Sequence, residues 1–230
     1  MSVFEIYKGD GGAKFMRPIH SREEYLQSRN TEKQQQTLAA VRSGDESRKS
    51  QLVQMNYSCL SNEDGSLKGS KRMSTMVGMD IDHLTAEEMP VVRQRILSKK
   101  DELGLLMMEE SARGGGYHLV FKRRPDLDQV GNLKWASELL EVAYDAQAKD
   151  ITRVFFTTTE NELVYLDDEI FTIDHSPLTI DHSQADVAAL TTVDPAGARH
   201  SSSELGSALA VAALQRCSSQ EASPQTSAII

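Results

Sequence analysis

Short segments of alternating or continuous apolar residues recur along most of the chain, and they predict strands separated by helices. We expect strands at residues 3–7, 57–60, 76–82, 105–108, 117–121, 154–156, 163–166 and 170–173. Capping residues and apolar spacing predict helices that begin near Ser21 and Thr85, and further helices at residues 31–42 and 132–144. Strands alternating with helices favour a mixed α+β domain of two layers.

The pattern changes after residue 175. Residues 176–230 contain no aromatic residue and are rich in Ser and Ala, which is typical of a linker or an unstructured tail. Apolar residues at helical spacing within residues 204–216 can form one helix. We therefore predict a folded domain at residues 1–175 and a Ser/Ala-rich tail at 176–230.

The predicted strand at residues 76–82 carries the first candidate site. Asp80 and Asp82 are one residue apart, so in an extended strand both side chains point to the same face. Two carboxylates that close together need a positive partner, and a divalent cation such as Mg²⁺ or Mn²⁺ prefers oxygen ligands of this kind. The alternative is a D-x-D triplet in a solvated turn.

A glycine-rich segment, S-A-R-G-G-G-Y-H, precedes the strand at residues 117–121. Successive glycines let a backbone approach a ligand closely and offer amide N–H groups to an anion. The candidate phosphate-binding residues of this loop are Ser111, Arg113, Gly115, Gly116 and His118. The alternative is a tight hairpin in which a neighbouring residue satisfies His118.

A third acidic position follows the helix predicted at 132–144. Asp145 can complete a three-carboxylate metal site, and Arg153 can neutralise a phosphate or brace a carboxylate. Asp150 competes with Asp145 for the third-ligand role, or else pairs with Arg153. The sequence leaves this choice open.

Two basic segments can contact nucleic acid, although a formal net charge of −9 argues against non-specific coating of nucleic acid. One lies in a Gly/Ser/Lys-rich loop before the D-x-D strand, and the other follows the strand at 117–121. Their basic residues are Lys68, Lys71, Arg72, Lys122, Arg123 and Arg124. The alternative for the loop is an ordinary solvated basic segment.

The motifs M-D-I-D-H-L, S-A-R-G-G-G-Y-H-L-V-F and Y-D-A-Q-A-K-D-I-T-R-V-F-F occur in this order. Together they resemble the archaeo-eukaryotic primase superfamily, and more narrowly the primase-like N-terminal domain of virulence-associated protein E-type proteins of mobile elements. The resemblance covers roughly residues 40–171. It implies a primase-polymerase catalytic core with an RRM-like sheet.

The resemblance also implies residue roles and partners. Asp80 and Asp82 would hold two catalytic Mg²⁺ or Mn²⁺ ions, Asp145 would match the third acidic motif, and Ser111 and His118 would match the motif that grips a nucleoside triphosphate. The other implied partner is a single-stranded DNA template. Because the chain has no Walker A motif, a helicase or ATPase module would act in trans or belong to a longer parent chain.

Three functions remain open from the sequence: a metal-dependent primase-polymerase, a non-catalytic DNA-binding or replication module with the same fold, and a metal-dependent nuclease. Apolar runs too short for a membrane span, and an N-terminus without signal-peptide features, predict no membrane association. Cys59 and Cys217 lie far apart in the sequence, so we expect no disulfide framework and a cytoplasmic location.

Overall fold

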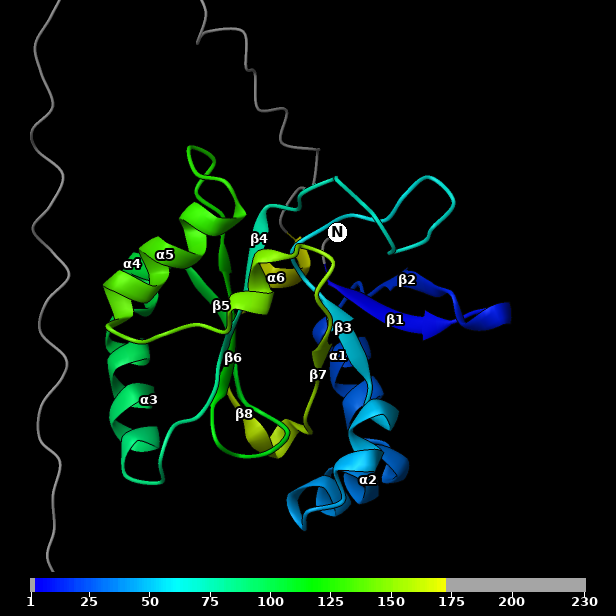
Figure 1. Ribbon diagram of the computed structural model, residues 1–230, viewed down its shortest axis with the longest axis horizontal. Coiled ribbons are helices and arrows are strands. Elements are labelled where there is room, and N and C mark those ends of the chain that lie inside the picture. The colour runs from blue at the N-terminus through cyan, green and yellow to red at the C-terminus, as the bar shows by residue number, and fades with distance from the viewer. Residues whose placement is uncertain (1–2, 173–230) are drawn as a thin grey trace, which may run out of the picture. The chain divides into compact units, whose positions relative to one another are not determined.

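The computed structural model describes residues 3–172, all within the compact unit Met1–His182. These residues form a mixed α+β fold with two four-stranded antiparallel sheets, which confirms the mixed α+β class. The predicted arrangement in two layers is wrong, because one sheet has helices on one face and the other sheet on its other face. Figure 1 shows helices α3, α4 and α5 on one side of strands β4, β5 and β6, and strands β1–β3 on the other side. The tail predicted at 176–230, with its helix at 204–216, lies outside the described residues.

The first sheet has the strand order β2-β1-β3-β7. Its strands are β1 (Phe4–Lys8), β2 (Lys14–Pro18), β3 (Gln54–Asn56) and β7 (Phe155–Phe156). Strand β2 was not predicted, and the strand predicted at 57–60 is wrong because the chain turns out of the sheet there. The Asn56 side chain accepts a hydrogen bond from the Cys59 N–H at 3.1 Å, which closes this turn.

The second sheet has the order β4-β6-β5-β8 and carries the candidate site. Its strands are β4 (Met76–Ile81), β5 (Leu105–Glu110), β6 (Tyr117–Lys122) and β8 (Leu163–Leu166). The strands predicted at 105–108, 117–121 and 163–166 are confirmed. In β4 and β6, Asp80 stands directly opposite His118.

The helices are α1 (Arg22–Arg29), α2 (Glu32–Arg42), α3 (Glu88–Ser98), α4 (Lys100–Leu103), α5 (Gln129–Leu140) and α6 (Glu169–Thr172), with short 3₁₀ turns η1 (Asp10–Gly12), η2 (Glu46–Gln51), η3 (Ala146–Lys149) and η4 (Glu160–Glu162). Ser21 and Thr31 cap α1 and α2 by accepting backbone N–H groups, and the cap at Ser21 was predicted. Before α3, Thr85 and Glu88 exchange two such bonds in a capping box.

Two further element predictions are wrong in the described region. Helix α5 ends at Leu140, because Glu141 adopts a left-handed conformation with φ 51°, so residues 142–144 are not helical. The segment predicted as a strand at 170–173 is helix α6 up to Thr172. The Asp167 carboxylate starts that helix by accepting the Glu169 N–H at 2.9 Å.

The second sheet buries both of its faces. Residues of α3 and α5 pack on one face, around Met79, Ile81 and Leu119. The other face contacts the first sheet in an apolar cluster that includes Met76, Met107 and Phe155. Alternation along β4 puts Asp80 on the same face as Met76, so this carboxylate lies on the side of the first sheet.

The loop between β5 and β6 crosses closely over the end of β4. Its Gly115 carbonyl accepts the Leu84 N–H at 3.0 Å. A Cβ atom on Gly116 would lie 1.9 Å from the Ile81 carbonyl oxygen, whereas a Cβ atom on Gly115 would lie 3.8 Å from its nearest neighbour, the Leu84 carbonyl oxygen. Glycine is therefore required at position 116 by contact with the protein's own backbone.

This contrast predicts unequal effects of two neighbouring substitutions. We expect Gly116→Ala to lower the free energy of unfolding by about 3 kcal/mol, because backbone must move to admit the methyl group. The control Gly115→Ala should change it by less than about 0.5 kcal/mol. Chemical denaturation followed by circular dichroism measures both. Equal stabilities of the two variants would contradict the close approach of the loop to β4.

Candidate metal centre

Three carboxylates that are distant in the sequence come together at the end of β4. Asp80 is the last residue of β4 whose side chain is on the side of the first sheet. Asp82 follows the strand, and Asp145 belongs to the segment after α5. One oxygen from each carboxylate lies within 4.8 Å of the others. This group can hold a metal ion, because carboxylate oxygens are the ligands that hard divalent cations prefer.

Asp145 is positioned by local hydrogen bonds. Its backbone N–H donates to the Asp80 carbonyl at 2.8 Å, which ties the segment to β4. Its side chain caps the 3₁₀ turn η3 and accepts the Gln147 N–H at 3.0 Å. Asp145 therefore begins a turn, and the prediction that it directly follows helix α5 is wrong.

Asp150, the other candidate for the third ligand, does not join the group. Its carboxylate accepts the N–H and the hydroxyl of Thr152 at 2.9 and 2.8 Å. It forms no ion pair with Arg153, which instead reaches Asp145 and Asp80. Within residues 3–172, Asp145 supplies the third carboxylate.

Asp80 has the environment expected of a metal ligand. It is 5% exposed, and its Oδ1 atom has no hydrogen-bond partner among the described residues. Burial raises the pKa of Asp80, opposed by His118 and Arg153 and reinforced by the negative charges of Asp82 and Asp145. A buried carboxylate oxygen without a partner beside two further carboxylates fits a bound cation, which would offset this unfavourable charge.

Arg153 partly neutralises the group from its outer side. Its Nη2 atom lies 3.4 Å from Asp145 Oδ2 and 3.7 Å from Asp80 Oδ2. Its Nη1 atom donates to the Gln147 side chain. The guanidinium is about a third exposed, so it can also reach a ligand in solvent.

His118 links the carboxylates to the interior of the sheet. Its Nε2 atom lies 3.6 Å from Asp80 Oδ1, and its Nδ1 atom is hydrogen-bonded to Glu109 Oε1 at 2.9 Å. Because an ionised carboxylate only accepts, Nδ1 carries a proton. Burial lowers the pKa of His118, but the hydrogen bond with Glu109 and the charges of Asp80, Glu109 and Asp82 outweigh it and raise that pKa.

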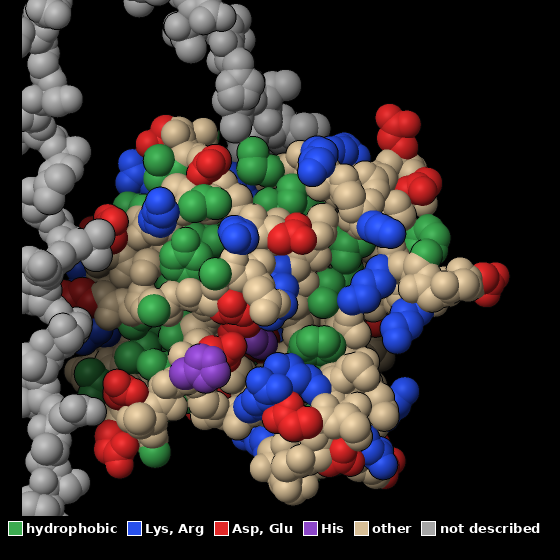
Figure 2. Space-filling model, in the orientation of Figure 1, with side chains coloured by type: hydrophobic (Ala, Val, Ile, Leu, Met, Phe, Trp, Pro, Cys, Tyr) green, Lys and Arg blue, Asp and Glu red, His purple; other side chains and the backbone are tan. Residues whose placement is uncertain are grey.

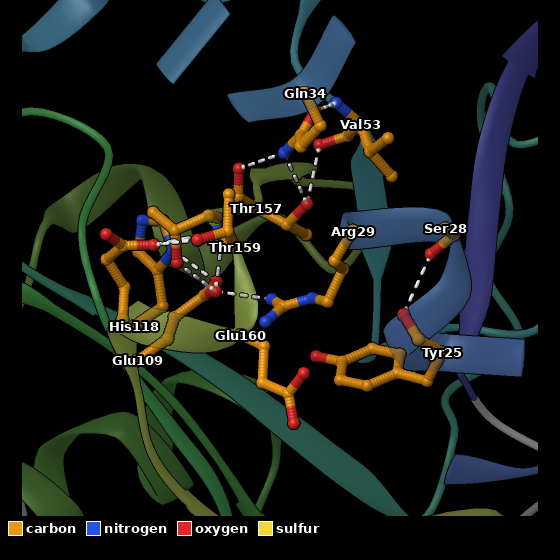
Figure 3. A network of polar contacts seen from close by, with 12 residues as sticks. Tyr25, Ser28, Arg29, Gln34, Val53, Glu109, His118, Thr157, Thr159 and Glu160 are labelled. Carbon is orange, nitrogen blue, oxygen red and sulfur yellow. Dashed lines mark hydrogen bonds and ion pairs between the residues drawn. The ribbon is translucent and has the colours of Figure 1, made fainter. Parts of the chain in front are cut away.

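Glu109 is held by a fully buried ion pair with Arg29 of α1. Figure 3 shows these two side chains joined within a wider polar network. Glu109 Oε2 also accepts the Thr158 N–H and hydroxyl at 3.2 and 2.8 Å. Burial would raise the pKa of Glu109, but Arg29, His118 and Thr158 together lower it to about 2.

The predicted ligand-binding residues of the glycine loop differ in their burial and in their contacts. Ser111 is buried, and its hydroxyl has no partner among the described residues, so it is available to a ligand. Arg113 forms a two-pronged ion pair with Glu46, with N–O distances of 2.7 and 2.9 Å from its Nε atom. Arg113 must leave Glu46 to contact a phosphate. Gly116 is explained by the backbone crossing over β4, whereas a Cβ atom at Gly115 would have no neighbour closer than 3.8 Å.

The predicted basic residues divide into two sets. Lys68, Lys71 and Arg72 lie on the exposed loop before β4. Lys122 pairs with Glu169, and Arg124 lies over the Trp135 ring. Lys122 is about 13 Å along β6 from His118. Arg123 is buried and donates to the Ser74 and Met76 carbonyls. Its assignment to a DNA-contacting surface is therefore wrong.

The sequence interpretation missed Arg29, Glu109 and Thr158. Glu109 ends a run of four apolar residues in β5, and a charged residue at the end of a buried strand was the available signal. Arg29 looked like an ordinary basic residue in the last turn of a helix. Only the tertiary fold pairs the two.

Comparison of the chain with protein-family models, curated proteins and solved structures gives no match. Among residues 3–172, no helix is both long enough and apolar enough to cross a membrane. On the face seen in Figure 2, acidic and histidine side chains lie together near the centre, with basic side chains beside them.

The buried ion pair predicts a strong effect of removing one partner. We expect Arg29→Met to lower the free energy of unfolding by about 3–5 kcal/mol, because Glu109 would remain buried without its counter-charge. The double variant Arg29→Met/Glu109→Gln should recover much of this loss, since glutamine is neutral and still accepts the His118 proton. Urea denaturation at pH 7 measures both variants.

The pH dependence gives a second readout of the same pair. The pKa of Glu109 is about 2 in the folded chain against an ordinary value of 4.5, so the unfolded chain binds more protons between these values. The stability that Glu109 contributes is therefore present above pH 4.5 and lost as the pH falls toward 2. If the double variant Arg29→Met/Glu109→Gln were as unstable as Arg29→Met at pH 7, an unpaired buried charge on Glu109 would not explain the loss of stability.

The carboxylate group predicts stabilisation by divalent cations. At a Mn²⁺ concentration 100 times Kd, we expect about 2.7 kcal/mol of added stability and a rise in Tm of roughly 5–10 °C, reversed by a chelator. Asp80→Asn should abolish the response, while Asp150→Asn, outside the group, should keep it. Thermal unfolding with and without Mn²⁺ measures this. An equal response in both variants would place the cation elsewhere.

Proposed function

We propose that this chain is a metal-dependent nucleotidyltransferase of the primase-polymerase type, which joins nucleotides on a single-stranded DNA template in the cytoplasm during replication of a mobile element. The observation that supports it is the convergence of Asp80, Asp82 and Asp145 with His118 directly opposite Asp80. The same four residues carry the motifs that resemble the primase superfamily.

Asp80, Asp82 and Asp145 would hold Mg²⁺ or Mn²⁺, and two ions are expected from the resemblance. Bound there, the metal would neutralise charge on a triphosphate and activate the attacking 3′-hydroxyl. The Oδ1 atom of Asp80, which has no hydrogen-bond partner among the described residues, supports this role. The Asp145 side chain is 22% exposed, which leaves one side of the carboxylate group open to a substrate.

The chain's own residues would bind and orient the nucleotide. His118 holds its Nδ1 proton toward Glu109, so its Nε2 side faces the carboxylate group. When both ring nitrogens are protonated, Nε2–H can donate to a phosphate oxygen next to the metal. The free hydroxyl of Ser111 offers a further donor from the glycine loop.

Arg153 gives the site a mobile positive charge. It lies at 3.4 and 3.7 Å from two carboxylates, distances that allow it to move to an incoming phosphate once a cation neutralises the acids. A nuclease needs the same acidic residues but has less use for a histidine and a serine hydroxyl aimed at a triphosphate. This combination favours nucleotidyl transfer over hydrolysis.

The proposal predicts labelled nucleotide incorporation on a primed or unprimed single-stranded template in Mn²⁺. Asp80→Asn should reduce the rate below detection, because it removes the central carboxylate. His118→Ala should reduce it about 10²-fold, as expected for loss of one charge-stabilising donor. Asp150→Asn is the matched control, since it changes a nearby acid outside the group, and should retain the wild-type rate.

Other outcomes separate the remaining hypotheses. DNA binding without incorporation in Mg²⁺, Mn²⁺ or Co²⁺ would overturn the proposal in favour of a non-catalytic replication module. Shortening of the template in the absence of nucleotides, lost in Asp80→Asn, would instead indicate a nuclease. Incorporation by the wild type that survives Asp80→Asn would reject this site as the catalytic centre.

A further inference from the structure

We infer that a groove between the β1–β2 hairpin and the loop at residues 62–72 binds the phosphodiester backbone of a single-stranded nucleic acid. The assignment of that strand as the template rests on the proposed function. The groove has a volume of ≈ 610 Å³, and its lining includes Lys14, Lys68 and the turn residues Gly11 and Gly12. Neither Lys8 nor Lys14 belonged to the basic segments predicted from the sequence.

Two lysines face each other across the hairpin. Lys8 of β1 is the register partner of Lys14 of β2, so both side chains stand on the same face of the sheet. Burial and the charge of Lys8 lower the pKa of Lys14. Like charges in directly opposite positions destabilise a strand pair, and this arrangement becomes favourable when a polyanion lies between them.

The loop at 62–72 brings Lys68 to the same place. It adds to the edge of β2 through two backbone bonds of 3.0 Å, from Leu67 N–H to the Lys14 carbonyl and from Met16 N–H to the Gly65 carbonyl. The Asn62 side chain donates to the Lys68 carbonyl at 3.0 Å and fixes the end of the loop. Lys68 therefore lies next to Lys14 on a braced backbone.

These cations have no carboxylate partners. Among residues 3–172, five of the six basic residues of the hairpin and loop join no ion pair, although many basic residues elsewhere do; the five are Lys8, Lys14, Lys68, Lys71 and Arg72, and the sixth, Arg17, pairs with Glu5. Lys14 donates to the Gln54 side chain at 2.9 Å, and Arg72 donates to the Ser61 carbonyl at 2.8 Å. The Asp64 carboxylate, within the loop, accepts a hydrogen bond from the Ser66 N–H. In Figure 2, basic side chains gather over this region, with acidic ones toward its rim. In a chain of net charge −9, this local excess of positive charge favours an anionic partner.

The groove and the candidate metal centre share one chain segment. Thr152 and Val154 belong to the groove lining, and the residue between them, Arg153, reaches Asp145 and Asp80. The groove lining and the guanidinium beside the carboxylates therefore come from consecutive residues. A strand bound in the groove would lie against the segment that carries Arg153.

A stacked aromatic pair lies on the other face of the hairpin tip. Tyr7 is 49% exposed and stacks on Phe15, with ring centroids 5.7 Å apart. This pair is next to the Lys8–Lys14 pair in the hairpin register, so its rings stand on the face opposite the two lysines. The rings therefore lie away from a backbone bound in the groove, and the choice of a single strand rests on the proposed template role.

The test measures binding of a fluorescent single-stranded oligonucleotide to the full chain by anisotropy at several salt concentrations. Lys14→Gln/Lys68→Gln should raise Kd by about tenfold at low salt and reduce the slope of log K against log salt by about 1.4, since each single-strand phosphate contact contributes about 0.7. Lys33→Gln/Lys134→Gln makes the same change in net charge on exposed lysines of α2 and α5 and should leave both values unchanged.

A single substitution separates this role from a structural one. Lys8→Gln removes the repulsion across the hairpin, so it should raise Tm slightly while weakening oligonucleotide binding by several-fold. A variant that binds less well although it is more stable cannot owe its defect to unfolding. A lowered Tm together with unchanged binding would overturn the inference.

The outcomes also separate the groove from the proposed function. A wild-type chain that binds the oligonucleotide through Lys14 and Lys68 but incorporates no nucleotide in any metal rejects the catalytic proposal and upholds the groove. A chain that incorporates nucleotides, with template Kd and salt slope unchanged in Lys14→Gln/Lys68→Gln, upholds the catalytic proposal and rejects the groove. Failure of the wild type to bind the oligonucleotide also rejects the groove.

Discussion

The buried ion pair between Arg29 and Glu109 fixes the arrangement on which the candidate site depends. Both side chains are fully buried, and a charge in such a place is tolerated only when it is paired. The pair joins α1 to the second sheet, and its remaining hydrogen bonds reach Thr158 and His118. Glu109 thus fixes the proton position of His118, and Arg29 of α1 holds Glu109 in place.

The row formed by Glu109, His118 and Asp80 crosses three neighbouring strands in register. Its charges alternate, with Arg29 positive, Glu109 negative, a histidine whose pKa is raised, and then the carboxylates. Each member favours the charged form of the next, but the Oδ1 atom of the last one, Asp80, lies 3.6 Å from His118 Nε2 and has no hydrogen bond among the described residues. The unbalanced charge is therefore left at the end of the row that faces Asp82 and Asp145.

The sequence was informative where local rules decide the structure. Alternation along β4, the caps at Ser21 and Thr85, and the strands on either side of the glycine loop were predicted because hydrophobic period and capping chemistry act over a few residues. From the residues alone, Asp145 and Asp150 were both candidates for the third carboxylate, and only the resemblance favoured Asp145. The place of Glu109 at the end of an apolar strand was a local signal of burial, but Arg29, 80 residues away in the sequence, could not be paired with it, because no local pattern links residues that far apart.

The same contrast explains why Gly116 and Arg123 were assigned ligand roles that their surroundings do not support. A glycine next to a candidate site suggests contact with a ligand, yet at position 116 the close neighbour is the Ile81 carbonyl. An arginine in a basic run suggests contact with phosphate, yet Arg123 is buried against carbonyls. In contrast, Lys8 and Lys14 belong to no basic run, but the hairpin register sets them opposite each other. The fold decides which basic side chains lack a carboxylate partner. Such side chains mark a surface for anions more reliably than the density of basic residues in the sequence.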